Sequence, residues 1–217
     1  MSWIDNLHSA NWNQASGICL FAYVLGCFTA GYYLVRLLAD EDIDIREIGS
    51  GSVGARNVGR VLGKPGFFLT VLCDFGKGAL AVAIARHFTG NEYLVALAMI
   101  AVVAGHIWPA QLRFHGGKGM ATSLGALLVY DPQLALTFAI LFLGLLVIFR
   151  RTVLPALAAL ACLPIAAMTL DRESTRVVLV SVLAVLVLVG HRKNLAEEIA
   201  HFIPRRNLDP KPDQTEL

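Results

Sequence analysis

Charged residues are scarce in this 217-residue chain, at 16%, whereas soluble domains carry about a quarter. Because 56% of the residues are apolar, the chain has too few polar side chains to cover a soluble fold. Its net charge of +2 is also too small to indicate a nucleic-acid partner. The high apolar fraction and the low charged fraction are instead explained by apolar runs that are long enough to cross a bilayer as helices. The composition therefore predicts an integral membrane protein.

Two further absences restrict the interpretation. Residues 1–15 contain no lysine or arginine, so we expect no cleavable signal peptide, and we expect the first apolar segment to be a permanent span. The cysteines lack the spacing of metal ligands, and we expect small buried hydrophobes rather than disulfides. They are Cys19, Cys27, Cys73 and Cys162.

Seven apolar segments predict an all-α membrane bundle with about seven transmembrane helices. They run roughly over residues 16–38, 65–87, 92–112, 119–130, 132–149, 153–170 and 174–191. The short fourth segment is either a half-helix packed inside the protein or, if it merges with the fifth, part of a six-span arrangement. We expect one membrane-embedded domain over 1–203 and a disordered polar tail over 204–217.

The basic residues predict the orientation of the bundle. With the amino terminus outside and the carboxy terminus cytoplasmic, the inner segments carry Arg46, Arg56, Arg60, Lys64, Arg113, Lys118, Arg150, Arg151, Arg192, Lys193, Arg205, Arg206 and Lys211. The outer segments carry only Arg86, Arg172 and Arg176. This orientation also places the polar clusters described next on the cytoplasmic side.

The first polar cluster is the glycine-rich stretch 49–60, which we interpret as a loop between helices. Its glycines allow successive backbone N–H groups to point at an anion, and its arginines match the geometry of phosphate. It is not a P-loop, because no Gly-Lys-Ser/Thr closes it and no strand precedes it. A flexible connection is the alternative. The candidate ligands are Ser50, Gly51, Gly54, Arg56, Asn57 and Arg60.

The second cluster follows the third apolar segment, where Pro109 should kink or end the helix. The run Gly116-Gly117-Lys118-Gly119 then leads into the next helix, whose free N–H groups and positive dipole end favour an anion. A loop with a topology-setting lysine is the alternative. His106 belongs to the same cluster.

The third cluster, Gly190-His191-Arg192-Lys193-Asn194, leaves the last span. His191 and Asn194 are three residues apart and would share a helix face. A histidine here can bind phosphate or move protons near neutral pH, although an ordinary interface histidine is the alternative. Inside the second span, Asp74 and Lys77 are expected to form a structural ion pair, with a polar pocket as the alternative.

These clusters resemble, in order and spacing, the motifs of the bacterial acyl-phosphate:glycerol-3-phosphate acyltransferases of the PlsY type. The first resembles Gly-Ser-Gly-Asn-Ile-Gly-Ala-Thr-Asn-x-x-Arg, the second Gly-His-x-x-Pro through Phe-x-Gly-Gly-Lys-Gly, and the third Gly-His-Arg-x-Asn. The resemblance extends from residue 16 to about 200 and includes Asp74 with Lys77. The chain departs from the family pattern at Ser52, Arg56, Glu197 and His201.

The resemblance implies transfer of a fatty acyl group from acyl phosphate to the 1-hydroxyl of glycerol 3-phosphate, with no metal or cofactor. It implies catalytic roles for Ser50, His191 and Asn194. The implied substrate-binding residues are Gly51, Gly54, Arg56, Asn57, Arg60, His106, Gly116, Gly117, Lys118 and Gly119. An upstream enzyme that forms acyl phosphate is an expected partner, and the bacterial inner membrane is the expected location.

Two other functions fit the sequence, and a third is disfavoured. Ser52 and Arg56 leave open a family member with another phosphorylated acceptor. The glycine-rich breaks and the charges within spans also fit a small anion or phosphate transporter. The thioester-dependent glycerolipid acyltransferases are disfavoured, because none of the six histidines has an aspartate five residues later.

Overall fold

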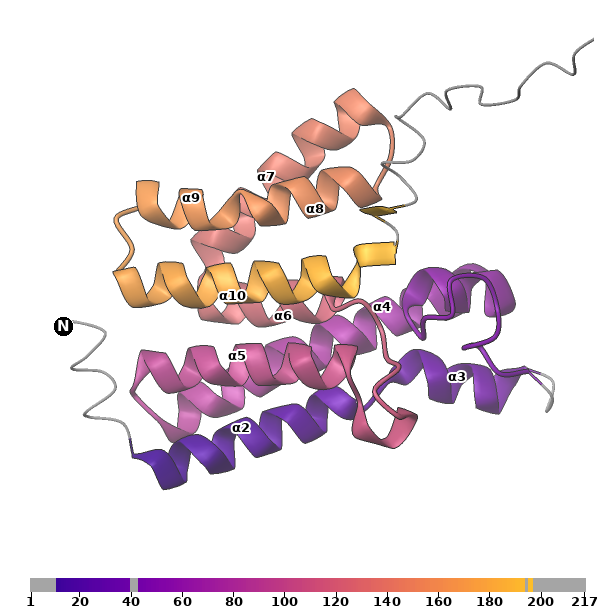
Figure 1. Ribbon diagram of the computed structural model, residues 1–217, viewed down its shortest axis with the longest axis horizontal. Helices are drawn as coiled ribbons and strands as arrows, with labels where there is room; N and C mark the ends of the chain where they lie inside the picture. The colour runs from indigo at the N-terminus through magenta and orange to yellow at the C-terminus, as the bar shows by residue number, and fades with distance from the viewer. Residues whose placement is uncertain (1–10, 40–42, 194, 197–217) are drawn as a thin grey trace, which may run out of the picture.

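The computed structural model describes residues 11–39, 43–193 and 195–196, and these residues form helices and loops without a strand (Figure 1). The helices are α2 (Trp12–Cys27), α3 (Ala30–Leu38), α4 (Ala55–Phe88), α5 (Glu92–Ile107), the 3-10 turn η1 (Ala110–Leu112), α6 (Met120–Tyr130), α7 (Pro132–Phe149), α8 (Val153–Ala161), α9 (Leu163–Thr169) and α10 (Ser174–Gly190). The predicted all-α class is confirmed. The predicted tail, 204–217, and the domain limit at 203 lie outside the described residues.

The helices are apolar enough for a membrane protein. Four stretches have the length and composition to cross a bilayer: Trp12–Leu38, Ala55–Phe88, Glu92–Leu112 and Pro132–Phe149. Three shorter apolar stretches accompany them: Met120–Tyr130, Val153–Thr169 and Ser174–Gly190. Large exposed apolar side chains such as Leu72 and Val147 cover the outside of the bundle, as helices in contact with lipid require.

The glycine-rich stretch 49–60 is not entirely a loop, and here the prediction from the sequence was wrong. The α4 helix begins at Ala55, well before the predicted start near residue 65, and bends at Gly63, where φ is 68°. Hydropathy detects only the part of a helix that lies in lipid, so the polar first turns of α4 were assigned to the loop. Arg56, Asn57 and Arg60 are therefore fixed on a helix.

Two other predicted segments are interrupted. The first segment breaks at Phe28 and Thr29 into α2 and α3, and the sixth breaks at Cys162 into α8 and α9. The fourth and fifth segments do not merge, because Asp131 ends α6 and caps α7 by accepting from the backbone N–H groups of Gln133 and Leu134, both at 3.2 Å. The α6 helix has only 11 residues.

Glycines set the closest helix contacts. A Cβ on Gly125 of α6 would lie 2.0 Å from the Phe75 carbonyl oxygen of α4, and a Cβ on Gly105 of α5 would lie 2.2 Å from the Tyr23 carbonyl oxygen of α2. Small residues at such crossings let backbones approach closely, which drives helix packing in membranes. Gly105, the first residue of the second motif, therefore packs α5 against α2.

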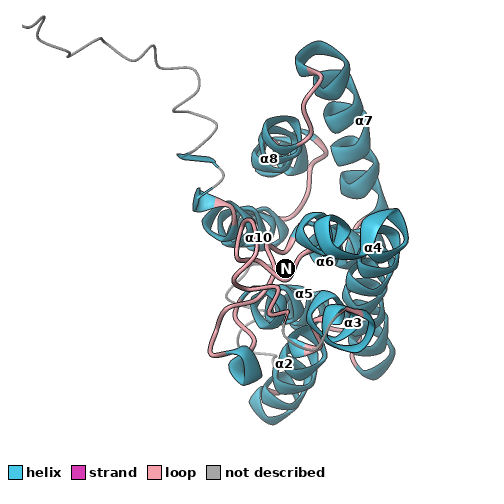
Figure 2. Cartoon of the chain, turned by 90° about the vertical axis from the view of Figure 1, so that its right-hand side faces the viewer, coloured by secondary structure: helices cyan, strands magenta, loops and turns pink. Residues whose placement is uncertain are grey.

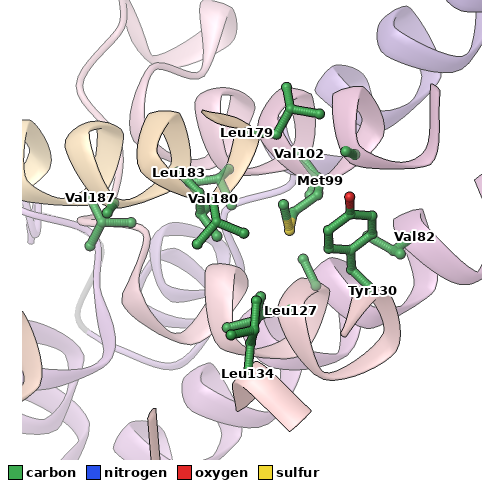
Figure 3. Packing of buried hydrophobic residues seen from close by; sticks show 14 of the residues in the cluster. Val82, Met99, Val102, Leu127, Tyr130, Leu134, Leu179, Val180, Leu183 and Val187 are labelled. Carbon is green, nitrogen blue, oxygen red and sulfur yellow. The ribbon is translucent and has the colours of Figure 1, made fainter. Parts of the chain in front are cut away.

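The main apolar core is formed by α5, α6 and α10 together with residues of α2, α4, α7, α8 and α9 (Figure 3). Met99 of α5, Leu127 of α6 and Leu183 of α10 are fully buried there. Because this core is close-packed, it fixes the ends of the three helices relative to one another. The second and third motifs lie at those ends.

The three arginines predicted on the outer side gather around two carboxylates at the end of the bundle opposite the motifs. Asp131 pairs with Arg172 and Arg176, each at 3.0 Å, and Glu92 pairs with Arg86 at 3.2 Å. These pairs connect α4, α5, α10 and the α6–α7 junction. They also offset the only positive charges of that end among the described residues.

The cysteine prediction was partly wrong. All four cysteines are free, as expected, but only Cys27 is buried; Cys19 and Cys73 are half-buried and Cys162 is exposed. An apolar segment of a membrane protein can face lipid, so apolar neighbours in the sequence do not imply burial in the protein.

Candidate functional site

A cavity of about 470 Å³ opens at the end of the bundle that carries the three motifs. Figure 2 looks onto this end, where the loops gather, with α7 and α8 above α4 and α6. The polar side chains that line the cavity are Ser50, Ser52, Arg56, Asn57, Asp74, His106, Lys118, Thr152 and His191. The apolar ones come from α4, α6, α7 and α8: Phe67, Val71, Phe75, Met120, Ala121, Leu124, Phe142, Val153 and Ala156.

Asn57 organises the first motif. Its side chain is only 1% exposed, and its Nδ2 donates to the carbonyls of Ile45 at 2.9 Å and Ile48 at 2.8 Å. Its Oδ1 accepts from the Ser50 backbone N–H at 3.4 Å and from Arg60 Nη1 at 3.1 Å. These four bonds use the full capacity of a side-chain amide. These contacts make Asn57 the residue that shapes the loop before α4. Asn57 also lines the cavity, and its predicted contact with substrate stays a prediction.

The first motif is joined to the second. The Val53 N–H donates to the Gly116 carbonyl at 3.4 Å, and Ser52 Oγ donates to the same oxygen at 3.5 Å. The turn through Gly51 has a positive φ of 65°, and Gly54 is the N-cap of α4. The first turn of α4 thus faces the cavity, where its N–H groups and dipole favour an anion.

The loop of the second motif folds back on the end of α5. That helix ends at Ile107, as Pro109 predicted. The Gly117 N–H donates to the His106 carbonyl at 3.0 Å, and a Cβ on Gly117 would lie 2.0 Å from His106 Nε2. A Cβ on Gly116 would lie 2.2 Å from the His106 carbonyl oxygen. Both glycines are needed for this close approach.

Lys118 and Gly119 are placed at the cavity by that loop. Gly119, with φ of 88°, is the N-cap of α6, so the lysine and the positive end of a helix dipole meet at one place. This is the arrangement that the sequence predicted for an anion. Of the other predicted ligands, Gly51, Arg60, Gly116 and Gly117 lie outside the cavity lining within the described part of the chain. Their contacts support the two loops, and their predicted contacts with substrate stay predictions.

The predicted ion pair between Asp74 and Lys77 is confirmed. Lys77 Nζ lies 2.9 Å from Asp74 Oδ1 and 2.8 Å from His106 Nδ1. It also donates to the carbonyls of Gly26 at 3.1 Å and Phe28 at 2.6 Å. These carbonyls belong to the break between α2 and α3, so Lys77 satisfies backbone acceptors that the break leaves without helical partners. Asp74 and His106 also line the cavity, so the ion pair gives structural support and its carboxylate belongs to the cavity lining.

His191 of the third motif lies at the end of α10. Its Nδ1 donates to the Val187 carbonyl at 2.9 Å, which makes Nε2 the acceptor of the neutral ring. Burial lowers the pKa of His191, and the positive charges of Lys118 and Arg56 lower it further, against the opposing effect of the Val187 carbonyl. The cavity therefore contains a neutral imidazole beside two cations. Asn194 lies outside the described residues.

We expect a nuclear magnetic resonance titration of ring-labelled histidine to give His191, assigned through His191→Gln, a pKa below 6.5. Because the pKa of the folded state is lowered, the unfolded chain binds the proton first, and this residue reduces stability as the pH falls below 6.5. Removing one neighbouring charge with Arg56→Gln should raise the pKa. An unchanged pKa in that variant would show that the charge is not felt at the ring.

Thr152 is the polar residue of the cavity lining that was not predicted from the sequence. It lies between α7 and α8, outside all three motifs, and its Oγ1 accepts from Arg56 Nη2. Thr152 follows two arginines and precedes an apolar segment, and this local sequence gives no indication of a functional site. Only the fold brings it against residue 56.

A helical membrane protein with two helix N-termini, two cations and an apolar groove around one cavity is suited to a phosphate ester that carries a lipid tail. The chain belongs to the glycerol-3-phosphate acyltransferase family, whose sequence pattern it matches over residues 16–201. This confirms the resemblance recognised in the motifs.

Individual relatives agree with this assignment. The chain is 46% identical over 187 residues to glycerol-3-phosphate acyltransferase 1 of Desulfitobacterium hafniense (strain Y51), covering 86% of this chain and 92% of the relative. It is 39% identical over 183 residues to glycerol-3-phosphate acyltransferase of Synechococcus sp. (strain CC9902), covering 84% and 90%.

Solved structures of PlsY (YgiH), an integral membrane glycerol 3-phosphate acyltransferase, share the fold. The glycerol 3-phosphate form has a TM-score of 0.78 at 31% identity, and the lysophosphatidic acid form has a TM-score of 0.77 at 30% identity. Each comparison covers 86% of this chain and 92% of the PlsY chain. The described helices therefore form an integral membrane fold of this family.

Proposed function

We propose that this protein transfers a fatty acyl group from acyl phosphate to the 1-hydroxyl of glycerol 3-phosphate. The observation that carries the proposal is one cavity that joins residues of three distant motifs, two cations and an apolar groove. The names of the relatives and the two ligand forms of PlsY support glycerol 3-phosphate as the acceptor and lysophosphatidic acid as the product.

In the proposed reaction, the acceptor hydroxyl oxygen bonds to the acyl carbonyl carbon as the bond from that carbon to the phosphate oxygen breaks. Phosphate leaves with the bonding electrons, and the hydroxyl proton passes to His191 Nε2 or to a substrate phosphate oxygen. The acyl phosphate is already activated, so positioning of the two substrates supplies much of the acceleration. No metal or covalent nucleophile is required.

Polar residues of the three motifs have proposed roles in this reaction. Lys118 holds the phosphate of glycerol 3-phosphate, with the N-terminus of α6 behind it, and His191 Nε2 accepts from the acceptor hydroxyl. Ser50 and the N–H groups before α4 stabilise charge on the acyl carbonyl oxygen. Asn194 orients the hydroxyl together with Ser50. Asn57 and Arg60 act by shaping the loop that carries Ser50.

For the membrane arrangement, we propose seven spans with the amino terminus outside and the cavity at the cytoplasmic face of a bacterial cell membrane. The thirteen basic residues assigned inside, against three outside, support this orientation. An enzyme that forms acyl phosphate would then deliver it from the same side.

Two alternatives remain as outcomes of the test. The serine and arginine at positions 52 and 56 leave open another phosphorylated acceptor, which a panel of polyol phosphates would reveal. A phosphate transporter is less favoured, because the polar residues of the three motifs gather around one cavity at one end of the bundle, whereas transporter sites lie near the midplane of the bilayer.

The test uses purified protein in lipid vesicles with palmitoyl phosphate and glycerol 3-phosphate. We expect phosphate release that depends on the acceptor, with 1-palmitoyl-glycerol 3-phosphate as the product by mass spectrometry. Palmitoyl-CoA and palmitoyl-acyl carrier protein serve as rival donors and should not replace acyl phosphate. No release with any acceptor, together with phosphate uptake by the vesicles, would replace the enzyme by a transporter.

A further inference from the structure

Thr152 directs its hydroxyl away from the helix that it begins. It is the N-cap residue of α8, a position where a threonine side chain normally accepts from the first turn of its own helix. Here the Thr152 backbone is in the αR region, with φ −104° and ψ −26°, and its side chain makes no capping bond. Its Oγ1 instead accepts from Arg56 Nη2, 96 residues earlier in the chain. Thr152 therefore bonds Arg56, a cation that lines the cavity, rather than the first turn of its own helix.

The bond between Arg56 and Thr152 lies where the polar and apolar parts of the cavity meet. Thr152 is followed by Val153, which lines the apolar part together with Phe142. Arg56 lies close enough to His191 for its charge to lower the pKa of that histidine. Of the two proposed substrates, only acyl phosphate has a phosphate joined directly to an apolar chain, so its phosphate belongs at this junction.

We propose that Thr152 is a positioning residue that holds Arg56 at this junction, where the guanidinium binds the phosphate of the acyl donor. The inference deepens the proposed function and rests on it. A guanidinium has five N–H donors, so a bond to Thr152 is compatible with bidentate binding of phosphate. Lys118 at the N-terminus of α6 provides a separate place for the phosphate of the acceptor.

The test compares KM values for the two substrates in vesicles. Thr152→Val keeps the shape of the side chain and removes the acceptor, and we expect the KM for palmitoyl phosphate to rise about fivefold, the effect of one hydrogen bond. The KM for glycerol 3-phosphate should change less than about twofold. Thr152→Ser should restore the wild-type value. Thr137→Val is the matched control, because Thr137 Oγ1 bonds only the Gln133 carbonyl within α7.

A double-mutant cycle tests whether Thr152 acts through Arg56. Arg56→Thr alone should raise the KM for palmitoyl phosphate about tenfold or more, and adding Thr152→Val should raise it no further. Independent, additive effects would overturn the inference, and so would a larger effect on glycerol 3-phosphate than on palmitoyl phosphate.

Binding of a non-reactive palmitoyl phosphonate separates this inference from the proposed reaction. Weaker binding to Thr152→Val than to wild type, with equal thermal unfolding, supports the role of Thr152 even if turnover is absent. Equal binding to the two proteins overturns it. Intact phosphonate binding by a wild-type protein that transfers no acyl group would count against the proposed reaction alone.

Discussion

Replacing Lys118 with methionine should lower acceptor-dependent phosphate release at least about a hundredfold. Methionine keeps most of the length of lysine but removes the charge that meets the N-terminus of α6 at the cavity. Because Lys118 is proposed to hold the phosphate of the acceptor, its loss would misplace the acceptor hydroxyl, and a small misplacement of a bound substrate can cost about a hundredfold in rate. Initial rates at several glycerol 3-phosphate concentrations would measure the loss.

The matched control is Lys64→Met, because Lys64 is an exposed lysine beside the bend of α4. It should leave the rate unchanged. A Lys118→Met protein with the wild-type rate would remove Lys118 from the site. Equal losses in both lysine variants would point instead to a general effect of positive charge at the membrane surface.

The second large effect is expected on stability. Lys77→Met should destabilise the folded protein by about 3–5 kcal/mol, because it leaves the Asp74 carboxylate buried without its lysine partner. It also removes the donor to the Gly26 and Phe28 carbonyls at the break between α2 and α3. Thermal unfolding in detergent, followed by the fraction of protein that stays monodisperse, would measure the loss.

The double variant Asp74→Asn/Lys77→Met identifies the cause of that loss. Neutralising the carboxylate should recover part of the stability, because the two residues share one interaction. If the double variant unfolds at no higher a temperature than Lys77→Met, the loss of stability comes mainly from the unpaired backbone carbonyls rather than from the buried charge. A wild-type unfolding temperature in Lys77→Met would show that the pair contributes little.

Sequence reasoning succeeded where a local pattern determines the structure. Apolar runs marked the helical segments, because burial in lipid requires continuous apolar side chains. Pro109 marked the end of α5, since proline cannot continue a helix. Three ordered motifs identified the family, and Lys118 was expected at a helix N-terminus, where the structure places it.

Sequence patterns did not predict structure that depends on a polar segment or on contacts between residues far apart in the chain. The first turns of α4 were missed because hydropathy does not detect a polar helix at an interface. The four bonds of Asn57 within the loop before α4 are a structural role that no local pattern indicated. The close packing of Gly116 and Gly117 on His106 is another.

By itself, then, the sequence determined the membrane class, the helical segments, the family and most of the polar residues at the cavity, because these follow from composition, spacing and short motifs. Only the tertiary structure decided which residues meet there and which support them. Lys77 reaches Gly26 across 51 positions, and Arg56 reaches Thr152 across 96. Such contacts depend on how whole helices pack, and no local pattern in the chain encodes that packing.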